Sequence, residues 1–526
     1  MERGVWLTIE KFLGTDVESS PLSLPPEVSP DLLNVYGDGT FVAKRPGVLR
    51  AAGGTQMSVS DYGYDVIHYL GHRDDEATAT GSPSDGLIMA TPISTINSRM
   101  FLYDSINNSI TAVPGSMSGG DGYFTFAAGR NFLAWGNNES GSGIGPCCLR
   151  HTSGTSPYYY LFRATTWPTT LNGVAAPGRG VGAWFREHAI WVYARDRRFV
   201  DEVLISEFND PSLYPIKLAI NPRGRLNLLG GLHVNGDICY IGSPTDVWAL
   251  TGSNRETFQI QRMPFGHGFM GMRSFTVHNG KSIGIVTRQG FAAAANNFPE
   301  DTPENIAIMS GASQELIGDR VLSLIRQSTT QAWIDCHAKS WPTLGGVLFL
   351  PRRAGSTAAA RDMLFWDDTS GTFWEWNIAS AVSPNALEFA DNILYMVTQD
   401  SRLKYFDTAE EQDDGTDMTS YWGSGLIVYP EGFPRRKFAI DRAIVFGTAG
   451  TGTGDATFSV SAEGGAFQSM GTFALAAAGT EINIAGRDNN NPGYFQNVRA
   501  TFAAGRAGST IRRVSLLLKP IGNPVS

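Results

Sequence analysis

The chain is dominated by short runs of β-branched and aromatic residues that are interrupted by Gly, Asn, Asp and Pro. Residues 99–103 (RMFLY) lead through an Asn/Asp-rich loop into residues 109–113 (SITAV), for example. Residues 183–193 and 363–376 follow the same plan, each with turn residues in the middle. Runs of this length between turn residues are typical of antiparallel strands joined as hairpins. The pattern therefore predicts a chain built from successive hairpins.

The composition argues against long helices. Glycine accounts for 60 of the 526 residues, and charged residues make up 17% of the chain, against about 25% in an average soluble protein. Exposed helix faces need Glu and Lys, which are scarce here, whereas Thr, Val, Ile and aromatic residues favour strands. We therefore expect an all-β protein. One amphipathic helix is predicted at residues 315–327, where apolar residues recur at helical spacing.

Groups of three or four predicted strands recur about every 40 to 65 residues, which is typical of divergent β-propeller blades. Stacking blades around an axis covers both faces of each sheet and leaves only short edges. The sequence predicts an irregular propeller of six blades, followed by a C-terminal β-sandwich-like domain. Stacked sandwiches would use the same strands and remain an alternative. Residues 114–155 are rich in Gly and Ser and do not fit the pattern, which leaves the number of blades open.

The predicted domain organisation has four parts. Residues 1–50 are Pro-rich and are expected to form an extended arm and a first strand, because proline disfavours helices and central strands. Residues 51–407 form the propeller body. Residues 408–420 are acidic and rich in turn formers, so we expect a linker there. Residues 421–526 carry strands whose number and spacing suit a small sandwich.

The charge and the cysteines exclude several classes of protein. A net charge of −9 argues against a protein that grips nucleic acid, although it is compatible with a conduit past which DNA slides. Mild acidity is equally explained by solubility. Four cysteines do not make a disulfide framework in a chain of this size. No apolar run approaches the roughly 18 residues of a membrane span, and no signal-peptide pattern opens the chain, so we expect folding in a reducing cytoplasm.

The motifs that resemble catalytic sites do not meet their structural requirements. Residues 280–284 spell G-x-S-x-G, but a nucleophile elbow needs a strand before Ser282 and a helix after it. An Asn-Gly turn precedes Ser282 and a β run follows it. His68 and His72 lack a third metal ligand at a recognised spacing. The sequence therefore predicts no catalytic, cofactor or metal site, and a protein that is not an enzyme.

Several stretches resemble the nozzle, or tail tubular, proteins of short-tailed bacteriophages. Near the start, Asn34 is followed by a Gly-bearing turn and by Lys44-Arg45-Pro46-Gly47. Further stretches of this kind are residues 203–212, 246–252, 282–290 and 512–520, together with Gly268 and Ser274. Each motif is short, and together they touch about half of the chain.

The resemblance implies a structural virion protein, assembled in the host cytoplasm and located in the phage tail. Six copies would form a ring that continues the DNA channel, retains the packaged genome and opens for ejection. Its partners would be other copies of itself, a tail adaptor above, tail fibres or a tail tip, and the passing genomic DNA. No cofactor and no membrane span are implied.

Two alternative functions are weighed against the nozzle. Exposed tryptophans could bind host glycans in a receptor-binding tail protein, although alternation within strands favours a core role for the following residues: Trp184, Trp191, Trp248, Trp366, Trp374 and Trp376. A sialidase-like propeller glycosidase would carry S-x-D-x-G-x-x-W hairpins. Around Gly371 and Trp374 this pattern fails, because Asp367 and Thr369 stand where Ser and Asp are required.

Two charged groups are candidates for lining the channel or a subunit interface. The first group lies in the acidic segment and consists of Asp413, Asp414 and Asp417. The second group precedes a predicted strand of the sandwich and consists of Arg435, Arg436 and Lys437.

Overall fold

The structure is a computed structural model that describes residues 4–54, the strands between residues 66 and 175, and most of residues 181–521. The longer gaps in this last range are residues 193–201, 210–215, 220–229, 293–298, 327–336, 351–362, 430–436, 449–455 and 484–491. The described residues are almost entirely in β-strands, so the all-β prediction is confirmed.

Seven antiparallel sheets, each with four main strands, follow one another along the chain, and we number them blade 1 to blade 7. Blade 1 consists of β8 (Val66–Tyr69), β9 (Gly86–Ser94), β10 (Asn97–Asp104) and β11 (Ser109–Ala112), with β12 (Met117–Ser118) beside β10. Blade 2 consists of β13 (Phe124–Ala128), β14 (Phe132–Asn137), β15 (Cys147–His151) and β16 (Tyr159–Arg163). Blade 3 consists of β19 (Val181–Phe185), β20 (His188–Val192), β21 (Glu202–Ile205) and β22 (Ile216–Ala219). A small ladder of β17 (Thr170–Leu171) and β18 (Val174–Ala175) precedes blade 3.

The remaining blades repeat the same up-and-down order. Blade 4 consists of β23 (Gly231–Asn235), β24 (Ile238–Gly242), β25 (Val247–Thr251) and β26 (Gln259–Arg262), and blade 5 of β27 (Phe275–His278), β28 (Lys281–Ala292), β29 (Pro299–Ser310) and β30 (Ser313–Leu316). Blade 6 consists of β31 (His337–Trp341), β32 (Gly346–Leu350), β33 (Met363–Asp367) and β34 (Thr372–Trp376). Blade 7 consists of β35 (Pro384–Ala390), β36 (Ile393–Thr398) and β37 (Leu403–Asp407), with β7 (Gly47–Arg50) as its fourth strand.

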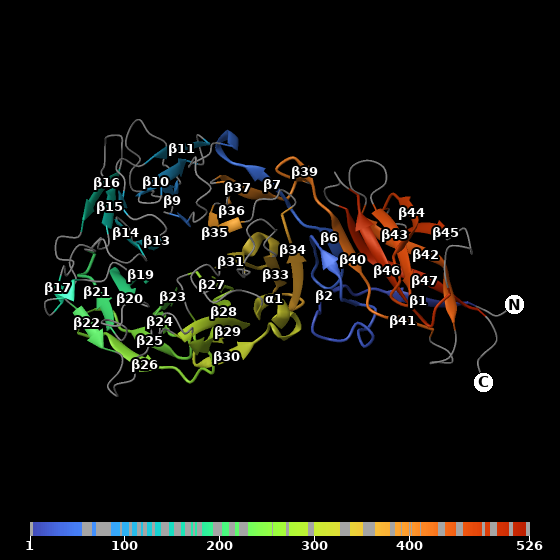
Figure 1. The fold of residues 1–526 in the computed structure, drawn as a ribbon, viewed down its shortest axis with the longest axis horizontal. Coiled ribbons are helices and arrows are strands. Elements are labelled where there is room, and N and C mark those ends of the chain that lie inside the picture. The colour runs from blue at the N-terminus through green and yellow to red at the C-terminus, as the bar shows by residue number, and fades with distance from the viewer. Residues whose placement is uncertain are drawn as a thin grey trace.

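The first strands of the seven blades contact one another in a closed circle. β8 of blade 1 contacts both β13 of blade 2 and β35 of blade 7, and the other first strands contact their neighbours in chain order. Figure 1 shows the resulting ring, with the blades coloured from blue-green to orange. A closed ring of antiparallel four-stranded sheets is a β-propeller, so the predicted fold class is confirmed.

The propeller has seven blades instead of the predicted six. Blade 2 falls partly in residues 114–155, where no blade pattern was recognised. Blade 7 is completed by β7, which pairs with β37 through Val48 and Phe406. A strand that lies far away in the sequence leaves no local signal in the blade that it completes.

The second body is a β-sandwich to which both ends of the chain contribute. One sheet contains β5 (Val35–Tyr36), β6 (Val42–Lys44), β47 (Thr510–Pro520), β42 (Phe438–Thr448) and β45 (Thr480–Asn483), with β1 (Val5–Ile9) also beside β47. The other contains β4 (Leu32–Leu33), β40 (Ser420–Gly423), β46 (Phe495–Phe502), β43 (Ala456–Ala462) and β44 (Gln468–Phe473), with β41 (Ile427–Val428) beside β46. Residues 4–50, from the segment predicted as an extended arm and a first strand, are thus built into both bodies.

The predicted helix at residues 315–327 is shorter in the structure. β30 extends to Leu316, and only a 3-10 turn at Asp319–Val321 and the helix α1 (Leu322–Arg326) follow. Gly318 breaks the helical pattern, because its backbone N–H donates to the side chain of Asn305 at 2.9 Å. Two further 3-10 turns lie at Ala52–Gly54 and Pro342–Leu344. Val321 and Ile325 of the predicted helix still pack inward and are fully buried, whereas Leu316 is exposed.

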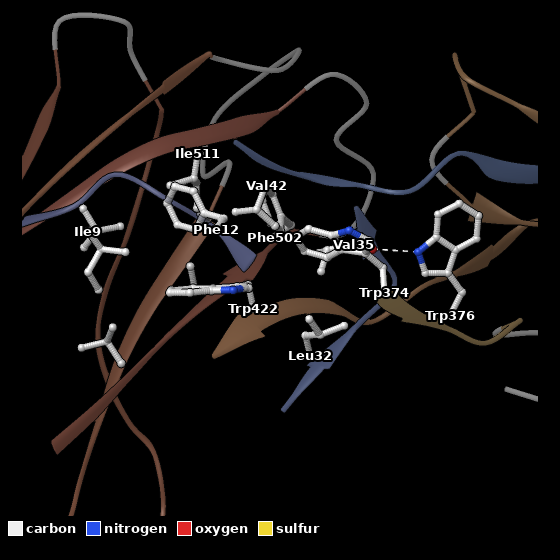
Figure 2. Close-up of a cluster of buried hydrophobic side chains, with 14 of the residues drawn as sticks. Ile9, Phe12, Leu32, Val35, Val42, Trp374, Trp376, Trp422, Phe502 and Ile511 are labelled. Atoms are coloured by element: carbon white, nitrogen blue, oxygen red, sulfur yellow. Dashed lines mark hydrogen bonds between the residues drawn. The ribbon is translucent and has the colours of Figure 1, made fainter. Parts of the chain in front are cut away.

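One hydrophobic core runs from the sandwich into blades 6 and 7. It joins Phe12, Trp422 and Phe502 of the sandwich to Trp376 of blade 6 and Phe406 of blade 7. Figure 2 shows this cluster, in which side chains of the N-terminal segment, of the sandwich and of β34 come together. The two bodies therefore share buried apolar surface, which is the main stabilising term in folding.

Candidate functional site

The chain crosses between the sandwich and the propeller twice, and the two crossings lie side by side. The first crossing leads from β6 into β7 at residues 44–47, and the second leaves β37 at residue 407 and enters β40 at residue 420. Between residues 407 and 420, the second crossing forms β38 (Gln412–Asp413) and β39 (Thr416–Asp417), and β38 pairs with β7. We call the residues that bind the crossings together, Asn34, Arg45, Asn377 and Asp413, the junction.

Arg45 donates to five acceptor atoms of four residues at once. Its Nε donates to Asn34 Oδ1 at 2.9 Å, and its Nη1 donates to Pro46 O at 2.7 Å. Nη1 and Nη2 also reach the two carboxylate oxygens of Asp413, at 3.0 and 2.5 Å. Nη2 donates to Asn377 O at 2.5 Å. All five guanidinium N–H groups can thus be used, which is the geometry in which a buried arginine is tolerated.

Asn34 connects the same segments from the other side. Its Nδ2 donates to Asn377 Oδ1 at 2.6 Å and to Thr419 O at 2.9 Å. Its Oδ1 accepts from Asn377 N at 2.8 Å in addition to Arg45. Asn34 has a positive φ of 54°, a backbone conformation that asparagine adopts more readily than most residues. The sequence places an asparagine where both the turn and the hydrogen bonds require one.

Both charges of the junction are removed from water. The side chains of Arg45 and Asp413 have 0% exposure. A buried pair of this kind contributes little net stability, but removing one partner typically costs about 3–5 kcal/mol because the other charge is left unpaired. The junction therefore specifies which segments meet, and it penalises any arrangement in which they separate.

Apolar and backbone contacts support the junction. Trp376 Nε1 donates to Val35 O at 2.7 Å, which is the dashed line in Figure 2. Phe12 lies edge-to-face on Trp422 with ring centroids 5.0 Å apart. The N-terminal segment also passes so close to blade 6 that a Cβ on Gly14 would lie 2.0 Å from Phe373 O. These contacts leave no room for movement of the N-terminal segment across β34.

A second ion-paired group lies next to the junction. The Asp414 carboxylate contacts Arg50 Nε and lies 3.1 Å from Lys404 Nζ. Burial alone would raise the pKa of Asp414, but the hydrogen bonds from Arg50 and Lys404 outweigh it, so that the pKa is lowered. The second crossing is thus held to blade 7 by charge as well as by strand pairing.

The structure separates the charged residues that were predicted as channel or interface candidates. Asp413 is fully buried within the chain, whereas Asp414 is ion-paired with Arg50 and Lys404. Residues 408–420 lead from blade 7 to the sandwich, and Asp413 and Asp414 within them are held against the propeller. Asp417 is exposed and accepts from Gln412 Nε2 at 2.7 Å. Lys437 is exposed and lies 5.2 Å from the centre of the Tyr494 ring.

Two of the candidates, Arg435 and Arg436, lie outside the described residues, as does His72 of the weighed metal pair. Within the described part of the chain, no group of three or more His, Cys, Asp or Glu residues is placed to hold a metal ion. No helix in that part is long and apolar enough to cross a membrane.

Ser282 of the G-x-S-x-G stretch contacts a histidine, but the pair is buried between two blades. His233 Nε2 of blade 4 lies 2.9 Å from Ser282 Oγ of blade 5. Burial lowers the pKa of His233 to about 3, which makes it a poor proton acceptor at neutral pH. Ser282 has 0% exposure. We conclude that this contact joins the blades, as does the one between His278 Nδ1 and Ser340 Oγ at 2.8 Å.

The tryptophans considered for glycan binding are core residues for the most part. Trp184 is half-buried, and the other five are buried: Trp191, Trp248, Trp366, Trp374 and Trp376. Their rings are therefore not available to sugars. The sequence had indicated this core role through the alternation within strands.

No known protein family and no curated protein matches the chain. Three solved structures illustrate what it is similar to. YCF48 bound to D1 peptide has a TM-score of 0.39 at 10% identity, over 69% of this chain and 96% of that one. BamB from Moraxella catarrhalis has a TM-score of 0.33 at 13% identity, over 65% and 97%. Exo-beta-1,3-galactanase from Phanerochaete chrysosporium has a TM-score of 0.30 at 10% identity, over 75% and 95%.

The galactanase corrects one prediction. The prediction that the chain is not an enzyme is withdrawn, because an enzyme is among the structures to which the chain is similar. At these TM-scores and identities the similarity assigns no activity to this chain. The fold itself rests on the strand pairing: the chain is a β-propeller protein whose seventh blade is completed by β7, a strand from the N-terminal segment.

Proposed function

We propose that the chain is a structural subunit of a bacteriophage tail, of the nozzle kind, located in the virion. The observation that carries the proposal is the junction, in which two chain crossings are bound together by the buried pair of Arg45 and Asp413. A subunit that retains a packaged genome must transmit force between its parts without deforming. The sandwich and the propeller are joined by two crossings that lie side by side, by a shared core and by a buried ion pair, and this construction suits that task.

The residues behind the resemblance add support. Asn34 and Arg45, which belong to the stretches that resemble nozzle proteins, are the two residues with the most contacts in the junction. Residues 246–252 coincide closely with β25, and residues 282–290 lie within β28. The first of these stretches thus belongs to the junction, and the other two form inner strands of blades 4 and 5.

The proposal implies several partners. Further copies of the chain would complete a ring of six around the tail axis, a tail adaptor would sit above the ring, and fibres or a tip would attach to it. Genomic DNA would pass without sequence-specific binding, which agrees with the net charge of −9. Obligate subunit interfaces in such an assembly bury more than about 2,000 Å² each.

Electron microscopy of the purified full-length chain tests the proposal. We expect rings with six-fold symmetry, with a particle mass six times that of the chain. Antibodies raised against the chain should label the tail below the portal in phage particles that carry it. A chain that remains monomeric at micromolar concentration, or trimeric rods labelled at the fibres, would contradict the nozzle and favour a receptor-binding protein.

A further inference from the structure

The free edges of the sheets differ in character. The outer strands of blades 4 and 5 are polar: β26 exposes Gln259, Gln261 and Arg262, and β30 exposes Ser313 and Glu315. Charged and polar side chains on an edge strand discourage pairing with another chain. These edges are protected in the way expected of surfaces that stay in water.

The strand β1 lacks this protection. It has the sequence VWLTI, without charge, glycine or proline, and it pairs with β47 over five residues without a register shift. Its outer side has no strand partner in the described part of the chain. Trp6 on this strand is 48% exposed. A regular apolar strand with unpaired backbone groups is a template for adding a further strand.

The opposite edge of the same sheet is formed by β45. Each neighbouring pair in the order β1, β47, β42 and β45 is antiparallel, so β1 and β45 run in opposite directions. If the sheet continued from one copy into the next, β1 would therefore meet β45 as an antiparallel neighbour. A contact between two different surfaces of this kind repeats from copy to copy, and it closes into a ring when the rotation allows it.

The charges at the two edges complement each other. Lys11 is exposed just after β1, whereas the neighbouring Glu10 lies 3.8 Å from Arg513 of its own chain. Glu481 on β45 lies 3.3 Å from Arg442 of its own chain, but it is 46% exposed and so remains accessible to a second cation. In the antiparallel arrangement, the N-terminal end of β45, which carries Glu481, comes level with the C-terminal end of β1, which leads into Lys11. The two unlike charges would meet across the contact.

We propose that β1 of one copy pairs with β45 of the next, so that one sheet of the sandwich continues around a ring of identical chains. This inference rests on the proposed function, because it names the contact by which the nozzle ring assembles. The main-chain hydrogen bonds of the added strand hold neighbouring copies together, and the contact between Lys11 and Glu481 fixes their register. Trp6 is covered in the ring.

Charge exchange in the full-length chain tests the contact. Lys11→Glu and Glu481→Lys should each raise the concentration at which rings dissociate about fivefold, since exposed ion pairs are worth little individually, and the double variant should restore it. Glu315→Lys on the edge of blade 5 is the matched control and should change nothing. Loss of ring formation in the double variant, or equal weakening by the control, overturns the contact.

Disulfide trapping supplies a second readout. The double variant Lys11→Cys, Glu481→Cys should form covalent oligomers under mild oxidation, and each single variant should form none beyond the level of the unchanged protein. Covalent dimers from a separate Thr8→Cys variant would overturn the proposal in favour of a two-fold contact between two β1 strands. Six-membered rings without trapping would overturn this contact and leave the nozzle standing, whereas trapped rings of another size would support the contact and contradict the nozzle.

Discussion

Arg45 and Asp413 stand 368 residues apart in the sequence and share two hydrogen bonds at a point where neither side chain reaches water. One belongs to the crossing that enters the propeller, and the other belongs to the crossing that leaves it. The pair therefore fixes the two crossings, residues 44–47 before β7 and residues 407–420 after β37, to each other where the propeller meets the sandwich.

Replacing Asp413 by asparagine should lower the free energy of unfolding by about 3–5 kcal/mol, because Arg45 is left as an unpaired buried charge. Urea titration followed by tryptophan fluorescence measures the change. Asp417→Asn makes the same chemical change four residues later on an exposed side chain, and it should cost less than about 0.5 kcal/mol. Similar losses from both variants would show that the junction does not stabilise the fold.

Gly14→Ala tests the close passage of the N-terminal segment over blade 6. A Cβ at this position would lie 2.0 Å from Phe373 O, so the segment or β34 has to shift. Overpacking of this kind costs about 1–3 kcal/mol, and we expect a lower midpoint of thermal unfolding. At Gly266 a Cβ would meet nothing within 4 Å, and Gly266→Ala is the control that should unfold as the unchanged protein does.

Trp376→Phe should cost about 2–4 kcal/mol, because it removes the hydrogen bond to Val35 O and leaves a gap in the shared core. Trp6→Phe removes an indole that is 48% exposed and should leave the unfolding free energy of the isolated subunit within about 0.5 kcal/mol. Denaturant titration of both variants separates the two effects. Equal stability of the two would contradict a core role for Trp376.

Acid should destabilise the contact between blades 4 and 5 through His233. The pKa of His233 is lowered to about 3 in the folded protein, against about 6.5 in the unfolded chain. Above pH 6.5 both states are neutral and stability does not change. Between pH 6.5 and 3 only the unfolded state binds the proton, so stability falls by about 1.4 kcal/mol per pH unit from this residue.

Unfolding free energies at pH 7.5 and 5.0 measure this dependence. His233→Gln removes the titrating group and should reduce the loss between the two pH values, even if the variant is less stable at both. His278 has a lowered pKa as well, because burial outweighs the opposing charges of Asp368 and Asp367, and it should account for part of the remaining slope. An unchanged slope in His233→Gln would contradict the assignment.

Local pattern was sufficient to predict the hairpins. The turn in residues 183–193 falls at Arg186 and Glu187, which both have positive φ values, and residues 363–376 form β33 and β34. These elements pair with their sequence neighbours, so strand and turn propensities determine them.

The contacts between distant residues could not be predicted in the same way. The segment at residues 408–420 looks like a solvated linker because acidic and turn-forming residues usually are solvated, and nothing nearby in the sequence shows that Arg45 lies against Asp413. Asn34 and Arg45 were singled out by resemblance, but their role depends on Asn377 and Asp413. The blade count was one short because blade 2 falls partly in residues 114–155, where no blade pattern was recognised, and because the fourth strand of blade 7 precedes its other three by most of the chain.

Closure by β7 has a consequence for synthesis on the ribosome. The partner of Val48 is Phe406, so the strand that completes blade 7 is made before the other blade strands and the edge that receives it is made after them. At translation rates of about 5–20 residues per second, the early strand waits roughly 20 to 70 s for its partner. A chain that terminates early has no receiving edge and stays open to proteolysis, so that only finished chains reach a compact state fit for assembly.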